Sequence, residues 1–138
     1  MSELAIFIYT GTHQALHHAL SLSVTALSYG EKTTLVLFNE GLAGWNDAFK
    51  AKRVGYGDSP WATVIEDGFR QLNVPNVPPM ARECREIGRD KLQILACSGS
   101  VEVLGLDSTA LIEDGIVDDV VGLPTIWRRT QSARLITV

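Results

Sequence analysis

Two cysteines and a group of histidines are the residues of this 138-residue chain whose types could support chemistry. Cys97 ends the apolar run LQILAC and is followed by Ser98, Gly99 and Ser100. A thiol at such a strand-to-helix turn faces the free N–H groups of the next helix, which favour the thiolate, the form that attacks sulfur or carbonyl centres. The sequence therefore indicates Cys97 as a candidate nucleophile, with those three amides as donors to its anion. A strand-end cysteine that only packs is the alternative.

Cys84 occupies a different kind of position. It falls at helical spacing with Val77, Met80, Ala81 and Ile87, on the apolar face of an expected helix. Burial disfavours the thiolate, so we predict a small, inert core residue. The two cysteines form neither a CxxC motif nor a disulfide framework.

Three histidines lie at the start of the first expected helix: His13, His17 and His18. His13 and His17 are one turn apart, a spacing that can hold a metal. No carboxylate or further cysteine is clearly placed to complete such a site, so we predict no metal. His13 is instead a candidate acid–base partner for Cys97.

The turn Thr10-Gly11-Thr12 joins the first expected strand to that helix. Such a turn could cradle a phosphate, and flavodoxins bind FMN at the corresponding place. The same residues are also ordinary turn residues, and no GxGxxG or Walker A pattern occurs. We therefore expect no cofactor, and keep FMN or another small ligand at this turn as the alternative.

Apolar runs alternate with helical periodicity, which predicts a parallel sheet with right-handed crossovers. The expected strands are Leu4–Thr10, Thr33–Phe38, Leu92–Cys97, Asp119–Val121 and Leu135–Val138. The simplest arrangement is a flavodoxin-like three-layer α/β fold with a five-stranded, mostly parallel sheet in the order 2-1-3-4-5. That order would place strands one and three side by side, so that Thr10–His13 and Cys97–Ser100 share one rim where ligands bind.

Between the strands, helices are expected wherever apolar residues recur at helical spacing. Ser59 can cap one of them with Pro60 at its first position. Residues 39–58 are long for a plain connector, so we expect part of them to be helical or to form an interface. The aromatics Trp45, Phe49 and Tyr56 within them suggest an interface between copies of the chain. We therefore expect a homo-oligomer.

Composition and length favour a single-domain protein and argue against nucleic-acid-binding and membrane-spanning proteins. The length favours one domain over residues 1–138, and the 46% hydrophobic content suits a sheet buried on both faces. The net charge of −4 argues against a nucleic-acid surface, and no apolar run is long enough to span a membrane. The apolar start Leu4–Tyr9 lacks the basic flank of a signal peptide, so a cytoplasmic protein is expected.

From about residue 77 onward, the chain resembles the DsrE/DsrF-like family, which includes TusD-type sulfur-relay subunits and members labelled peroxiredoxin-like. The most specific element of the match is Cys97 followed by Ser100 and Gly105. Further matching stretches are Leu111–Gly115, Val121–Thr125 and Arg134–Val138. Residues 39–73 match poorly.

The resemblance implies a flavodoxin-like fold assembled as trimers or hexamers. In sulfur-handling members the cysteine at the position of Cys97 carries a persulfide or thiosulfonate between rhodanese-like and TusA-like proteins. The expectation is therefore a sulfur carrier or sulfurtransferase. A small-ligand or FMN-binding module and a non-catalytic oligomeric protein are the alternatives.

Overall fold

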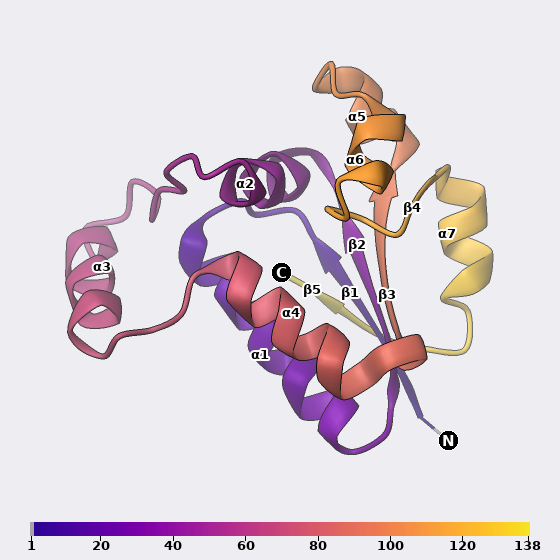
Figure 1. Cartoon of the computed structure of the whole chain (residues 1–138), viewed down its shortest axis with the longest axis horizontal. Coiled ribbons are helices and arrows are strands. Elements are labelled where there is room, and N and C mark those ends of the chain that lie inside the picture. The colour runs from indigo at the N-terminus through magenta and orange to yellow at the C-terminus, as the bar shows by residue number, and fades with distance from the viewer. Residues whose placement is uncertain (1) are drawn as a thin grey trace.

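The computed structural model describes residues 2–138, in which helices alternate with the strands of one sheet (Figure 1). The strands are β1 (Glu3–Ile8), β2 (Lys32–Leu37), β3 (Leu92–Cys97), β4 (Asp119–Val121) and β5 (Arg134–Thr137). The helices are α1 (His13–Ser28), α2 (Asn39–Phe49), α3 (Ala62–Gln71), α4 (Val77–Gly88), α5 (Ser98–Val103), α6 (Ser108–Glu113) and α7 (Leu123–Arg129), with a 3-10 turn η1 (Arg89–Lys91) before β3. All five expected strands are present, and the α/β class is confirmed.

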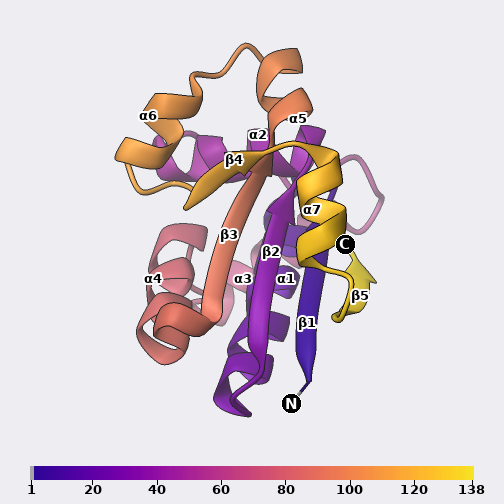
Figure 2. The same cartoon turned by 90° about the vertical axis from the view of Figure 1, so that its right-hand side faces the viewer.

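The sheet is parallel throughout, in the order β4-β3-β2-β1-β5. The expected order was therefore wrong, because β2 lies between β1 and β3. Each of the first three crossovers advances the sheet in the same direction, and only the connection through α7 returns to the far side of β1 (Figure 2). Periodicity identifies strands, but the side on which the next strand pairs depends on packing over the whole sheet.

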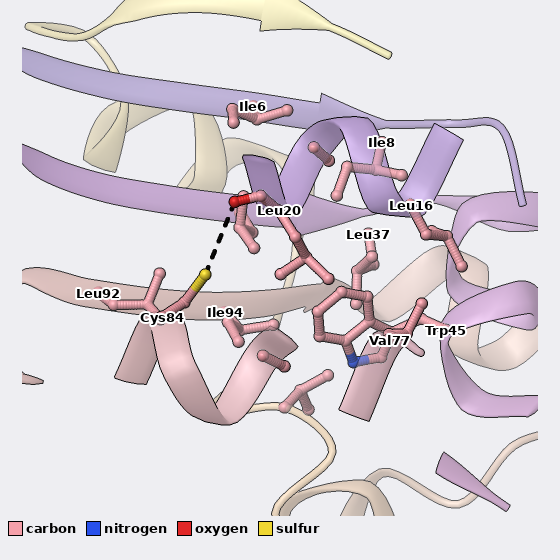
Figure 3. Close-up of a cluster of buried hydrophobic side chains, with 14 of the residues drawn as sticks. Ile6, Ile8, Leu16, Leu20, Leu37, Trp45, Val77, Cys84, Leu92 and Ile94 are labelled. Carbon is pink, nitrogen blue, oxygen red and sulfur yellow. Dashed lines mark hydrogen bonds between the residues drawn. The ribbon is translucent and has the colours of Figure 1, made fainter. Parts of the chain in front are cut away.

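One face of the sheet holds the larger core, covered mainly by α1, α2 and α4. Alternate residues of β1, namely Leu4, Ile6 and Ile8, point into it, as the two-residue period of a strand requires. Figure 3 shows Ile6 and Ile8 on the same side of the sheet as Leu16 and Leu20 of α1. The apolar spacing in the sequence correctly predicted this face of α1.

Among the helices of residues 2–138, α7 alone covers the opposite face (Figure 2). Its smaller core contains Ala5, Phe7, Val36, Phe38, Leu95 and Ile126, with Cys97, Val121 and Ala133 packed against it. Only Ile126 of α7 is buried there, so much of this helix remains exposed.

The long connector between β2 and α3 begins with a helix, α2, that lies against the carboxyl end of β1. The turn at Gly11 and helix α2 are in close backbone contact, because a Cβ on Gly11 would lie 2.0 Å from the Glu40 carbonyl oxygen and one on Gly44 2.3 Å from the Gly11 carbonyl oxygen. Trp45 is fully buried and donates from Nε1 to the Ile116 carbonyl at 2.9 Å. Trp45 therefore belongs to the core of the monomer, and the prediction that it marks an interface was wrong.

The segment from Ala51 through α3 projects from the body of the molecule (Figure 1). Helix α3 begins at Ala62 rather than at Pro60, because the Ser59 hydroxyl accepts from the Trp61 amide and forms a turn before the helix. None of its residues is buried. Apolar residues recur at helical spacing along this segment, but Trp61, Val64 and Leu72 among them are exposed. No helix within residues 2–138 has the length and apolar character needed to cross a membrane.

Candidate functional site

Cys97 is the last residue of β3 and the cap residue of α5. Its backbone is extended, with φ −71° and ψ 125°, and its side chain is half-buried. The thiol packs toward the α7 face, where its partner across the ladder is Val121 of β4. Cys97 therefore lies at the carboxyl edge of the sheet, the edge at which open α/β folds bind ligands.

Cys84 has the opposite environment, as predicted. It is completely buried beneath α1, and its Sγ donates to the Leu20 carbonyl at 3.7 Å (Figure 3). Burial raises the pKa of the Cys84 thiol to about 11. At neutral pH this thiol is protonated and shielded from any donor.

The three residues after Cys97 form the first turn of α5, whose amides lack an intrahelical acceptor. Ser98 and Gly99 are exposed, and a Cβ on Gly99 would lie 3.9 Å from the Cys97 sulfur. Ser100 is buried, and its hydroxyl accepts from the Asn39 amide at 2.9 Å and donates to Asn39 Oδ1 at 3.1 Å. Thus the Ser100 side chain joins α5 to α2, and its hydroxyl is already engaged.

His13 is the first residue of α1, and its ring is buried between Tyr56 and Phe69, with centroid distances of 5.1 and 5.6 Å. Burial lowers the pKa of His13, and the charge of His17 lowers it further, against a smaller opposing effect of Glu66. The imidazole is therefore neutral at pH 7.

His13 and Cys97 share the carboxyl edge but lie toward opposite faces of the sheet, with β2 between their strands. The two residues were expected to be neighbours because strands one and three were expected to lie side by side. Because that order is wrong, the structure does not place the imidazole where it could exchange a proton directly with the Cys97 thiol.

The turn Thr10–Thr12 has few free donors for a phosphate. The Thr10 amide donates to the Val138 carbonyl and the His13 amide to the Gly55 carbonyl, while Thr12 caps α1 by accepting from Ala15. The adjoining hollow, about 280 Å³, is lined by the carboxylates of Glu40 and Asp47 as well as by Arg53. Gly11 is explained by the approach of α2, without any ligand.

No group of three or more histidine, cysteine or acidic side chains in the described part of the chain is arranged to hold a metal ion. His13 and His17 both pack against Phe69 of α3, with His17 at 5.0 Å. Their spacing therefore serves to attach α3 to α1.

Two clefts beside His13 were missed by the sequence reasoning. The larger, about 610 Å³, lies between the segment 48–56 and the start of α4, and the smaller, about 420 Å³, lies between that start and α3. Both are lined by His13, Tyr56 and Asn76. The signals available were the long connector and the proline-rich break before α4, but neither indicates that the two segments meet.

No protein-family model matches the chain, and no curated protein matches its sequence.

Proposed function

We propose that this protein is a cytoplasmic sulfur carrier or sulfurtransferase that holds a persulfide or thiosulfonate on Cys97. The observation that carries the proposal is the contrast between the two thiols: Cys97 is half-exposed at the carboxyl edge, whereas Cys84 is buried with a pKa of about 11. The resemblance of the sequence around Cys97 to DsrE/DsrF-like proteins favours the same atom.

The chemistry requires only a thiolate and a sulfane donor. Cys97–S⁻ attacks the outer sulfur of a persulfide R–S–SH, giving Cys97–S–SH and R–S⁻. With tetrathionate, attack on a central sulfur gives the thiosulfonate Cys97–S–S–SO₃⁻ and releases thiosulfate. The amides of Ser98, Gly99 and Ser100, in the first turn of α5, are the candidate donors to the anion, although the Cys97 side chain accepts no capping hydrogen bond from them in the structure. His13 takes no direct part.

The test is mass spectrometry of the intact protein after exposure to thiosulfate, polysulfide or tetrathionate. We expect wild type to gain sulfur mass at Cys97, Cys97→Ser to gain none while keeping its fold, and Cys84→Ala to load normally at a stability cost of about 1 kcal/mol. Loading that is equal in both variants, or wild type that reacts with no donor, would contradict the proposal.

In such a relay the partners would be a rhodanese-like donor and a TusA-like acceptor, with the carrier assembled as a homotrimer or hexamer. Persulfide transfer from a loaded rhodanese-type domain to Cys97, followed by mass spectrometry, tests the partners. If no sulfur moves although chemical donors load Cys97, the carrier proposal survives and the partner proposal fails.

A small-ligand module is the second candidate function, and the paired clefts beside His13 favour it. The FMN form of this candidate has weaker support, because the amides of Thr10 and His13 are bonded within the chain and α2 closes on Gly11. Inert thiols together with an intact assembly would favour a non-catalytic oligomeric protein.

A further inference from the structure

The larger cleft beside His13 has the features of a binding site separate from Cys97. We propose that it binds a small organic anion with an apolar body, such as a short-chain carboxylate. This inference does not depend on sulfur chemistry at Cys97.

The size and walls of the cleft suit such a molecule. Its volume of about 610 Å³ lies within the range of small-molecule sites. One part of the lining is aliphatic: Ala48, Ala51, Val54, Val77, Pro78 and Pro79. The polar part consists of His13, Lys52, Arg53, Tyr56 and Asn76.

Charge determines the class of ligand. Lys52 and Arg53 line the cleft, and no carboxylate does, although the whole chain carries a net charge of −4. Arg53 donates to both oxygens of Glu66 at 3.0 and 2.9 Å, whereas Lys52 makes no ion pair within residues 2–138. A locally cationic cleft on an acidic protein attracts an anion, and Lys52 has its charge available to pair with one.

The backbone argues against a phosphate as the anion. The start of α4 adjoins the cleft, but Pro78 and Pro79 have no N–H, and the Met80 amide donates to the Asn76 carbonyl at 3.3 Å. Phosphate sites usually use several backbone donors, which this helix start does not offer. A carboxylate needs fewer, and the Lys52 ammonium with the Asn76 amide can supply them.

The far wall is held in place before any ligand arrives. The His13 amide donates to the Gly55 carbonyl at 2.8 Å, and Gln14 Nε2 donates to the Tyr56 carbonyl at 2.7 Å. The neutral imidazole of His13 offers one donor and one acceptor to orient a ligand. Pre-organisation of this kind lowers the entropic cost of binding.

An NMR titration with hexanoate tests the proposal, with hexanamide and inorganic phosphate as comparison probes. We expect saturable shifts of the amides of Val54, Tyr56 and Asn76, with a Kd of about 1 mM, the affinity reachable by a ligand of this size. Hexanamide and phosphate should bind at least about tenfold more weakly. Equal binding of hexanamide, or no saturation by hexanoate up to roughly 20 mM, would overturn the proposal.

Two variants of identical charge change locate the site. Lys52→Glu should weaken hexanoate binding by about tenfold or more. Lys91→Glu is the matched control, because Lys91 is exposed beside Gly30 at the other end of α1, and it should leave the Kd unchanged. Equal effects of the two variants would mean that only net charge matters, and the assignment to this cleft would be wrong.

Discussion

The two thiols differ in burial and in their place in the fold. With a pKa of about 11, the Cys84 thiol is ionised to only about 10⁻⁴ at pH 7, and it is fully buried as well. Cys97 is half-buried and lies at the edge of the sheet. We expect iodoacetamide at pH 7.5 to alkylate Cys97 in the native protein and Cys84 only after denaturation. Peptide mass spectrometry measures both, and equal labelling rates in the native state would contradict this.

His13 couples stability to pH. Its pKa is lowered in the folded protein, first by burial and then by His17, so below the usual value of 6.5 the unfolded chain binds more protons. The contribution of the neutral imidazole is complete above about pH 6.5 and is lost as the pH falls through the lowered folded pKa. We expect the urea midpoint to fall between pH 7.5 and 5.5, with a smaller fall in His13→Phe, which keeps an aromatic ring between Tyr56 and Phe69.

The exposed His18 supplies the control for that experiment. His17, whose pKa is also lowered by burial, contributes its own share, so His13→Phe should reduce the slope without abolishing it. If His18→Gln reduces the slope as much as His13→Phe does, the effect does not come from burial of His13.

At this scale, spacing alone separated the two cysteines correctly, because helical periodicity places Cys84 on an apolar face and a strand end places Cys97 at an edge. The pairing of His13 with Cys97 could not be obtained in that way. It depended on which strands are neighbours, and one intervening strand was enough to separate the two side chains.

The packing of α2 on the carboxyl end of β1 depends on glycines. A Cβ on Gly41 would lie 2.2 Å from the Ile8 carbonyl oxygen and one on Gly44 2.3 Å from the Gly11 carbonyl oxygen, and in both cases the obstacle is backbone. We expect Gly41→Ala to lower the free energy of unfolding by about 3 kcal/mol, because either helix or strand must shift.

Gly68 in α3 is the matched control for that substitution. It also lies within a helix, but a Cβ added there would meet no atom of a neighbouring element within 4 Å. Gly68→Ala should therefore stabilise by up to about 1 kcal/mol, because alanine is the better helix former. Chemical denaturation measures both variants. Similar changes in the two would contradict the assignment, because close packing against backbone is present at Gly41 and absent at Gly68.

Local signals accounted for most elements and failed where an element is defined by its neighbours. The strands and α1 were predicted from the spacing of apolar residues along the sequence. A helix within residues 39–58 was one of two expectations, and its bounds were not predicted because the glycines of α2 weaken helix propensity. These glycines allow the contact with β1 and the turn after it. The start of α3 was misplaced because the Ser59 hydroxyl caps a turn rather than the helix.

The whole molecule exposes apolar side chains at both ends of its long axis (Figure 1). At the α3 end, Trp61 is 66% exposed and Leu72 78%. At the α7 end, Trp127 is 66% exposed, beside Leu123 at 54%. The charges differ as well, since Asp58 and Asp67 lie at the first end and Arg128 and Arg129 at the second. Asp67 is paired with Arg70 and Arg129 with Asp119, so Asp58 and Arg128 carry most of the difference. Exposed apolar patches of this kind mark interaction surfaces.

We expect the chain to form a homotrimer or a hexamer built from trimers, and two unlike patches give that expectation a geometric reason. A twofold dimer uses the same patch on both copies, whereas a threefold ring needs one patch to meet a different one on the next copy. The α3 end of one copy would then dock against the α7 end of its neighbour, with opposite charges at the contact.

Light scattering during size exclusion at micromolar concentration measures the assembly. Both Trp61→Ser and Trp127→Ser should release monomers, because each removes one half of the same interface. Tyr29→Ser, which changes another exposed aromatic residue outside both patches, should leave the oligomer intact. A wild type that is monomeric at that concentration would contradict the assembly. An oligomer that loses its subunits in only one of the tryptophan variants would instead indicate a twofold contact.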